Sequence, residues 1–280
     1  MKLSKLLFPF LICFLTPLSH AADLKVSVQL WSVRDDLKSD FRGTISKLAE
    51  MGFQGVELAG EYGEFSNDPE GLAQFIESKG MVISGTHTGF DLLTDEKIEN
   101  TLDYYRRAGV TAAIISWDER AFSEDTVWQT IADLNRLQPI VESHGIKFGY
   151  HNHAQEFGTY KDTTLWEHIG RSTKESLVMQ LDAGWAQFAS KDPAKLVETH
   201  AGRTLSTHYK AAANEADLGK LPLIGQDSLD WPALIEANRT VGGTEWVVLE
   251  QEEYPNGLTP LEAVLASKQA LDRYLAEREN

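Results

Sequence analysis

The chain has 280 residues and a formal net charge of −16, with 42 acidic residues against 26 lysines and arginines. A negative charge of this size repels nucleic-acid backbones and anionic membranes, so we expect neither as a partner. The single cysteine, Cys13, lies near the N-terminus inside an expected signal peptide. The mature chain would then have no disulfide and no thiolate ligand, and any metal would be held by nitrogen and oxygen atoms.

Residues 1–21 have the pattern of a secretory signal peptide. Two lysines precede an apolar run over 6–15, and the small-x-small sequence at 19–21 fits signal peptidase cleavage. The apolar run is too short for a transmembrane helix, which needs about 20 residues. We therefore expect a periplasmic or secreted protein whose mature domain covers residues 22–280.

The mature part alternates apolar or β-branched runs with segments of helical pattern. In chain order, each strand and the helix after it are expected over 25–31 and 40–52, 53–58 and 68–80, 81–87 and 95–108, 111–117 and 123–144, 146–152 and 164–171, 177–182 and 193–200, 204–210 and 229–238, and 245–251 and 260–276. Pro69 and Gly80 illustrate the usual start and stop signals of these helices, while Pro139 predicts a kink in the fourth. Eight units of about 30 residues predict an α/β fold with one closed (β/α)8 TIM barrel.

Polar residues that commonly bind metals stand at the ends of several predicted strands. Asp182, His208 and Glu250 each follow an apolar run. The carboxyl ends of barrel strands meet at one rim, where TIM barrels carry their active sites. A carboxylate buried there without a partner would be costly. The pattern therefore predicts a pocket for a divalent metal ion.

The fourth metal ligand has two candidates near the fifth strand, Glu156 and His151. We favour Glu156, because a third carboxylate better balances the charge of a divalent cation. His151 and His153 would then orient the substrate or support the metal ligands. Lys210 lies two residues after His208, so both point to one side of the strand. Lys210 could stabilise an oxyanion or act as an acid.

Several of these segments resemble the xylose isomerase-like TIM-barrel superfamily, often called sugar phosphate isomerase/epimerase. The resemblance rests on YHNHAQEF, LDAGW, THYK, PLIGQDSLDW and VVLEQE, and it covers nearly all of the mature chain. It implies one divalent metal ion (Mn, Mg, Co or Zn) on two Glu, an Asp and a His, which here correspond to Glu156, Asp182, His208 and Glu250. Many members carry Glu on the fifth strand itself, where this chain has His151.

The resemblance implies a metal-dependent sugar isomerase/epimerase that acts through an enediolate-type intermediate. His153, Lys210 and His151 are then the catalytic candidates. The candidates for binding the sugar, at the ends of other strands, are Glu57, His87, Trp117 and Trp185.

Two other functions remain open from the sequence. Export favours free sugars or glycosides over phosphorylated metabolites, and some secreted relatives resemble lyases that release the C1 aglycone of a 3-keto-glycoside. A non-catalytic periplasmic sugar-binding protein is the alternative of another class. In each case the partner is a small-molecule sugar or glycoside, and the sequence leaves open whether the chain forms a homo-oligomer.

Overall fold

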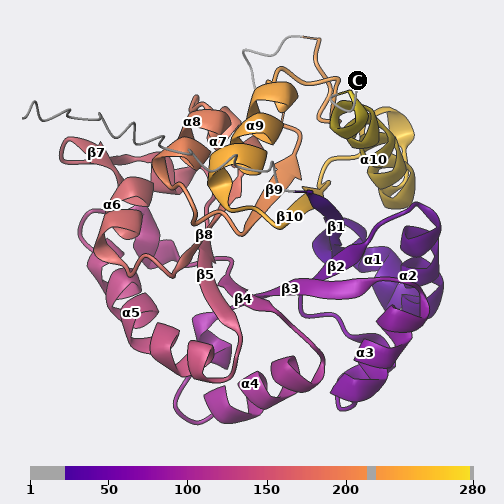
Figure 1. The fold of residues 1–280 in the computed structure, drawn as a ribbon, viewed down its shortest axis with the longest axis horizontal. Helices are drawn as coiled ribbons and strands as arrows, with labels where there is room; N and C mark the ends of the chain where they lie inside the picture. Colours follow the sequence, from indigo (N-terminus) through magenta and orange to yellow (C-terminus); the bar gives the residue numbers. More distant parts are fainter. Residues whose placement is uncertain (1–22, 213–218, 278–280) are drawn as a thin grey trace, which may run out of the picture.

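Eight parallel strands form a closed barrel, and helices surround it (Figure 1). A computed structural model describes residues 23–212 and 219–277, so the expected signal peptide, 1–21, lies outside the described residues. The strand order around the barrel is β1-β10-β9-β8-β5-β4-β3-β2. The barrel strands are β1 Lys25–Gln29, β2 Gly55–Leu58, β3 Val82–Thr88, β4 Ala112–Ile115, β5 Lys147–His151, β8 Val178–Asp182, β9 Ser206–Lys210 and β10 Trp246–Glu250. The predicted TIM barrel and its eight strands are confirmed.

The predicted helices are also present, with two short additions. The helices are α1 Arg34–Ser39, α2 Phe41–Glu50, α3 Pro69–Ser78, α4 Ile98–Arg107, α5 Val127–Ser143, α6 Leu165–Ser172, α7 Ala183–Phe188, α8 Pro193–Thr199, α9 Trp231–Ala237 and α10 Pro260–Ala276. The additions are α1 and α7, which have six residues each and were not predicted. A small hairpin, β6 Thr159–Tyr160 and β7 Thr163–Thr164, precedes α6. In the described part of the chain, no helix is both long and apolar enough to cross a membrane.

The barrel has a large apolar layer between its strands and helices, and a much smaller one inside. The inner cluster contains Ala112, Ile114 and Val178. Glycines face this interior where a side chain would not fit. A Cβ on Gly55 would lie 2.9 Å from the Trp246 ring. The narrow interior thus closes the bottom of the barrel and leaves the carboxyl ends of the strands for the polar side chains.

Gly149 gives a direct test of this packing. A Cβ there would meet Ile114 Cδ1 at 2.6 Å and the Val178 carbonyl oxygen at 2.7 Å. We expect Gly149→Ala to lower the free energy of unfolding by roughly 3 kcal/mol, because the backbone of β8 must shift. Urea unfolding of both proteins measures this. Adding Ile114→Val should recover only part of the loss, since the carbonyl contact remains. An unchanged unfolding midpoint in Gly149→Ala would contradict the packing argument.

Candidate metal centre and substrate pocket

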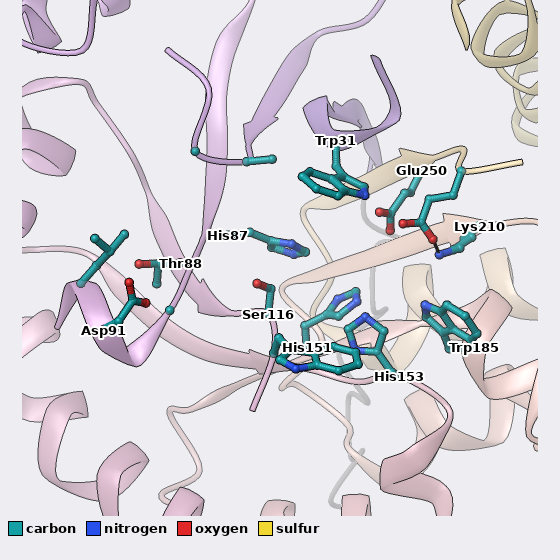
Figure 2. A pocket seen from close by; sticks show the side chains of 16 residues that line it. Trp31, His87, Thr88, Asp91, Ser116, His151, His153, Trp185, Lys210 and Glu250 are labelled. Atoms are coloured by element: carbon teal, nitrogen blue, oxygen red, sulfur yellow. Dashed lines mark hydrogen bonds and ion pairs between the residues drawn. The ribbon is translucent and has the colours of Figure 1, made fainter. Parts of the chain in front are cut away.

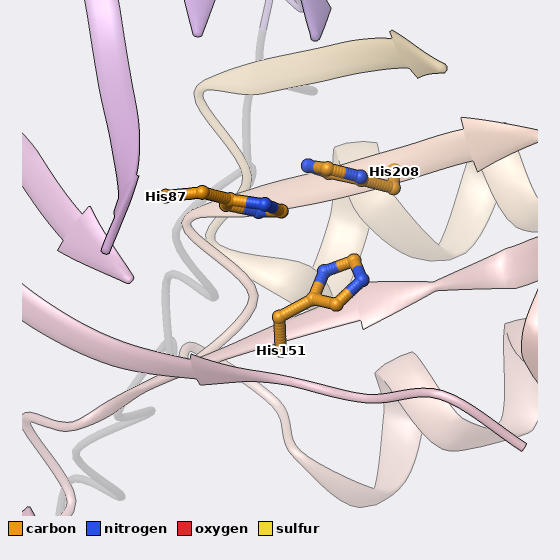
Figure 3. A group of neighbouring side chains, drawn as sticks. All are labelled: His87, His151 and His208. Atoms are coloured by element: carbon orange, nitrogen blue, oxygen red, sulfur yellow. The ribbon is translucent and has the colours of Figure 1, made fainter. Parts of the chain in front are cut away.

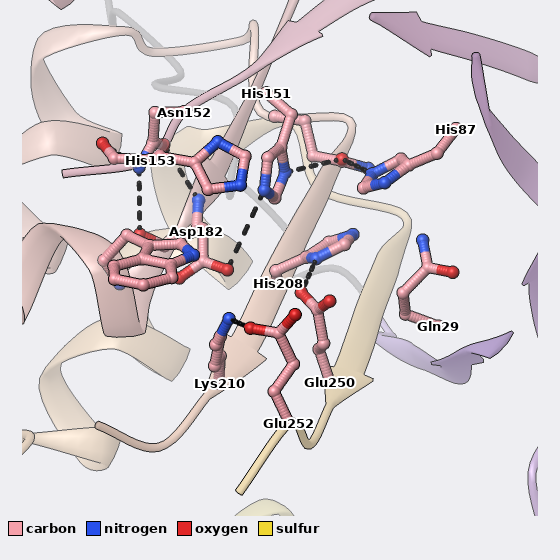
Figure 4. A network of polar contacts seen from close by, with 12 residues as sticks. Gln29, His87, His151, Asn152, His153, Asp182, His208, Lys210, Glu250 and Glu252 are labelled. Carbon is pink, nitrogen blue, oxygen red and sulfur yellow. Dashed lines mark hydrogen bonds and ion pairs between the residues drawn. The ribbon is translucent and has the colours of Figure 1, made fainter. Parts of the chain in front are cut away.

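Four neighbouring strands deliver metal-type side chains to one point at the carboxyl end of the barrel. These side chains are His151 on β5, Asp182 on β8, His208 on β9 and Glu250 on β10. All four are buried, and one ligand atom from each lies within 4.8 Å of those of the other three. The strand register explains this convergence, because Asp182 pairs with His208 across β8 and β9. Figure 4 shows the group and its polar contacts.

Asp182 offers one carboxylate oxygen to this group. Its Oδ1 accepts a hydrogen bond of 2.7 Å from the Trp185 backbone and so caps the start of α7. Its Oδ2 is buried without a hydrogen-bond partner among the described residues and lies 3.9 Å from His151 Nε2. Burial, together with the nearby Glu250 charge, raises the pKa of Asp182 to about 7 against the opposing Lys210 charge. A buried oxygen of this kind is stabilised by a cation, so the group fits a divalent metal ion.

His208 lies between two carboxylates. Its Nδ1 is 2.8 Å from Glu250 Oε2, and its Nε2 is 2.6 Å from Glu57 Oε2. Burial lowers the pKa of His208, but the two carboxylates outweigh it and raise the pKa to about 10. The resulting imidazolium balances the acidic groups when no other cation is present. A metal ion would take over this role from the proton on Nδ1, while Nε2–H stays bonded to Glu57.

A layer of amide side chains supports the ligand group from below. Gln180 Nε2 donates to Glu57 Oε1 (2.8 Å), and Gln29 Nε2 donates to Glu57 Oε2 (2.7 Å). Gln180 Oε1 lies 2.8 Å from His87 Nε2 and 3.0 Å from His151 Nδ1. Neither glutamine was predicted as a site residue from the sequence. Strand periodicity was the available signal, because Gln180 precedes Asp182 by two residues and shares its inward face.

Two expected roles change in this arrangement. Glu156 is not in the converging group, because its Oε1 accepts from the Tyr150 hydroxyl (2.7 Å) and its Oε2 from the His153 backbone N–H (2.9 Å). His151, at the end of β5, takes the fourth position instead. Glu57, which we expected to bind sugar, is 1% exposed and bonded to His208. It therefore supports the ligand group and does not line the pocket.

The burial of Glu156 has a measurable consequence. Desolvation raises its pKa to about 7, against the opposing effect of the Tyr150 hydrogen bond. A carboxyl with a raised pKa stabilises the fold most below its unfolded pKa, and this stabilisation is lost as the pH rises towards 7 and above. We expect the ionisation of Glu156 to lower the free energy of unfolding by up to about 3 kcal/mol as the pH rises from 4.5 to 8. Comparing urea unfolding of the wild type and Glu156→Gln across this range isolates the effect, since the variant should lack this part of the pH dependence. Parallel pH profiles would contradict it.

A cavity of about 610 Å³ opens over the ligand group (Figure 2). The expected residues His87, Trp117, Trp185, Lys210, His151 and His153 all line it, together with Glu250. Lys210 forms an ion pair with Glu252 and lies over the Trp185 ring, 4.4 Å from its centroid. This contact holds the lysine ammonium at the cavity wall.

His153 lines the cavity and lies outside the converging group. Its ring packs edge-on against Trp117 (4.7 Å between centroids) and lies 5.6 Å from Trp185. Its Nδ1 is buried and has no hydrogen-bond partner among the described residues. Burial, aided by the Lys210 charge, lowers the pKa of His153 to about 4. The ring is therefore neutral near pH 7 and able to accept a proton.

A second, overlapping group consists of the rings of His87, His151 and His208 (Figure 3). The His87 and His208 rings are stacked, with 5.0 Å between their centroids. His87 Nε2, however, is already bonded to Gln180 Oε1. The group that includes Asp182 and Glu250 supplies the negative charge that a divalent cation needs, so it is the better candidate.

Comparison with known proteins places this chain in a family. Residues 45–274 match the family described as xylose isomerase-like TIM barrel. The inosose dehydratase of Bacillus licheniformis is 24% identical over 270 residues, which cover 82% of this chain and 87% of that protein. The inosose dehydratase of Geobacillus thermodenitrificans is also 24% identical, over 82% of this chain and 88% of its own.

Two solved structures share the fold. One is a sugar phosphate isomerase/epimerase from Parabacteroides distasonis, with a TM-score of 0.72 and 19% identity over 90% of this chain and 98% of that one. The other is a probable 3-DHS dehydratase from Bacillus anthracis, with a TM-score of 0.69 and 15% identity over 89% of this chain and 99% of that one. The chain is therefore an enzyme of the xylose isomerase-like TIM barrel family.

Proposed function

We propose that this enzyme is a divalent-metal-dependent lyase that acts on a ketone-bearing sugar or a related cyclic polyol. It would remove the proton from the carbon next to the carbonyl, after which a substituent on the following carbon leaves. The observation that carries the proposal is the convergence of His151, Asp182, His208 and Glu250 beside the neutral imidazole of His153. The similarity to inosose dehydratases supports elimination, because a dehydratase expels water.

Each side chain has a definite task in this reaction. His151, Asp182, His208 and Glu250 would hold the cation, which when bound would polarise the substrate carbonyl and acidify the neighbouring C–H group. His153, whose neutral imidazole lines the cavity, takes that proton. Lys210, held against Trp185, donates a proton to the leaving oxygen.

The charges around the cavity favour an unphosphorylated substrate. Among the described lining residues, Lys210 is the only lysine or arginine, and it is already paired with Glu252. Asp91 and Glu250 add further negative charge to the lining. A phosphate group would lack the cationic partners that it usually requires. Export to the periplasm or beyond, as residues 1–21 suggest, agrees with a free sugar or glycoside as substrate.

Isomerisation or epimerisation is the second candidate, because it begins with the same proton removal. It is favoured by the presence of two separate proton-transfer groups, His153 after β5 and Lys210 on β9, which both contact Trp185. Reprotonation of a neighbouring carbon, or of the opposite face, needs such a second group. The structural similarity to a sugar phosphate isomerase/epimerase shows the shared fold.

The decisive experiment follows both proton exchange and bond cleavage. The purified enzyme, loaded with Mn²⁺ or Co²⁺, is incubated in D2O with inosose and, separately, with a 3-keto-glucoside. We expect deuterium uptake next to the ketone by NMR and release of water or the aglycone. Exchange with formation of an isomeric sugar and no cleavage would favour the isomerase/epimerase. Tight sugar binding with neither reaction would favour a sugar-binding protein and contradict the proposal.

His153→Asn gives the matched test of the base. We expect it to abolish deuterium exchange while metal binding, measured by calorimetry, stays close to that of the wild type, because His153 is not in the converging group. Full exchange in His153→Asn would assign the base to another residue.

A further inference from the structure

The substrate cavity is divided into two chemically different halves. On the side of the metal candidate it is lined by ionisable groups, which are His87, His151, His153, Lys210, Glu250 and Glu252. The other half is lined by apolar groups and glycines from the ends of β1 to β4, namely Trp31, Ala59, Gly60, Gly89, Leu92 and Trp117, together with the Asp91 carboxylate. Trp117 meets the first half where its ring contacts His153. Figure 2 shows Trp31 standing across the cavity from His151 and His153. The second half has no task in the chemistry proposed above.

Two tryptophans form the walls of the apolar half, and both are unusually open to solvent. Trp31 is 44% exposed and Trp117 is 47% exposed, although both line a cavity. Leu92, between them along the chain, is 37% exposed. Large exposed apolar side chains that share a cavity commonly mark a place where a ligand buries them.

Both tryptophan rings are held in place. The Arg34 guanidinium lies over the Trp31 ring, 4.6 Å from its centroid, and Arg34 Nη1 donates to the Trp31 carbonyl (3.0 Å). Trp117 makes edge contacts with Phe122 (4.9 Å) and with His153 (4.7 Å). Rings that are fixed before a ligand arrives lose little freedom when they bind it, which strengthens binding.

The size of the cavity also exceeds the needs of one sugar ring. Its 610 Å³ lies in the range of pockets for drug-sized ligands, roughly 300–1,000 Å³. A recess of about 190 Å³ continues it behind Trp31, and an open groove continues it beyond Trp117. A sugar whose carbonyl reaches His153 and Lys210 would leave this apolar half unfilled.

We propose that Trp31, Leu92 and Trp117 form a subsite for an aromatic substituent of the substrate, so that the enzyme prefers an aryl glycoside to a free sugar. This inference rests on the proposed function in one respect, which is that the sugar ring occupies the half of the cavity beside the metal candidate. An aromatic ring suits the site, because it can stack on or meet the edge of both indoles. Arg34 lies over the Trp31 ring but outside the lining of the main cavity, where the Asp91 carboxylate opposes an anionic substituent.

The test compares two unreactive glucosides that differ only in this substituent. Calorimetry on the full chain with Mn²⁺ should show phenyl glucoside, in at least one of its anomers, binding about tenfold or more tightly than methyl glucoside of the same anomer. Trp31→Ala and Trp117→Ala should each reduce this preference, and the double variant should abolish it. Trp31→Phe should keep most of it, because an aromatic face remains.

Trp128 provides the matched control. It is 60% exposed on α5 and does not line the cavity, so Trp128→Ala should leave the preference unchanged. Equal affinity for the two glucosides, no measurable binding of either, or a preference that survives in the double variant would each overturn the subsite.

Turnover separates this inference from the proposed function. With 3-keto forms of the same two glucosides, the subsite predicts a lower KM for the phenyl compound in the wild type and not in the double variant. Deuterium exchange without any phenyl preference would refute the subsite and leave the lyase standing. A phenyl preference in binding without any deuterium exchange would support the subsite and refute the lyase.

Discussion

Asp182→Asn is expected to abolish metal binding and to reduce kcat/KM by roughly a thousandfold, since carbonyl polarisation by a cation contributes several kcal/mol. Asparagine keeps the oxygen that caps Trp185 N–H at the start of α7. It replaces the unpartnered Oδ2 by an uncharged group. Metal content by mass spectrometry and affinity by calorimetry test the first effect, and steady-state kinetics test the second.

The same substitution should have the opposite effect on the stability of the metal-free protein. The pKa of Asp182 is raised to about 7, mainly by burial, so above that pH the buried charge destabilises the fold. At pH 8 and without metal, Asp182→Asn should therefore melt at the same temperature as the wild type or higher. Added Mn²⁺ should raise the melting temperature of the wild type only.

Asp192→Asn is the control for this experiment. Asp192 caps α8 through Ala194 N–H and Lys195 N–H and is not part of the converging group. It should leave metal binding and activity unchanged. If Asp182→Asn retained full metal content and full activity, the metal centre would have to be abandoned.

The fold was predictable because a barrel repeats one strong signal. A strand such as Trp246–Glu250 is buried throughout and so appears as a continuous apolar run with a polar end. The short helices α1 and α7 have no comparable pattern of apolar residues, because each has only six residues. Trp31 was expected to end the first strand, but it lies in a 3-10 turn over Leu30–Val33 that opens its ring to the cavity.

Three of the four converging side chains were expected from the sequence, whereas the fourth was left open between His151 and Glu156. Asp182 and Glu250 end regular strands, and His208 lies within the strand between them, so their convergence follows from the barrel. Charge balance favoured Glu156 over His151, but the chain turns after β5. After that turn, the Glu156 carboxylate accepts a hydrogen bond from the Tyr150 hydroxyl and does not join the converging side chains. Only the three-dimensional path of this loop decides between the two.

The supporting amides were overlooked for a different reason. A glutamine inside a strand, such as Gln29 or Gln180, carries no charge and matches no familiar metal motif. Its importance comes from neighbours distant in sequence, because Gln180 joins Glu57 on β2 to His87 on β3 and His151 on β5. Such a contact is set by the closure of the barrel and has no local signature.

Gln180 yields the second large prediction, which follows from the direction of its hydrogen bonds. An ionised Glu57 carboxylate can only accept, so the amide nitrogen of Gln180 must face it. The amide oxygen must then face the two imidazoles, and His151 must carry its proton on Nδ1. This leaves His151 Nε2, the nitrogen 3.9 Å from Asp182 Oδ2, free to bind a cation.

Gln180→Met keeps the length of the side chain and removes both functions of the amide. We expect metal affinity to fall 10- to 100-fold, the range found when groups that orient metal ligands are lost. Nitrogen NMR of the imidazoles in the metal-free protein should show the Nδ1–H tautomer of His151 in the wild type. In Gln180→Met it should show a mixture of tautomers, a change that general destabilisation would not produce.

Gln180→Glu and a distant glutamine separate orientation from packing. Gln180→Glu preserves an acceptor for His151, so the Nδ1–H tautomer of His151 should persist. It also places a second carboxylate against Glu57, so the contact between Glu57 and His208 should weaken. Gln138 is equally buried but lies on α5, bonded to Glu142 and Ser176. Gln138→Met should lower stability and leave both the metal affinity and the imidazole spectrum unchanged. If Gln180→Met behaved like Gln138→Met, the amide would only fill space, and the orientation of His151 would have another cause.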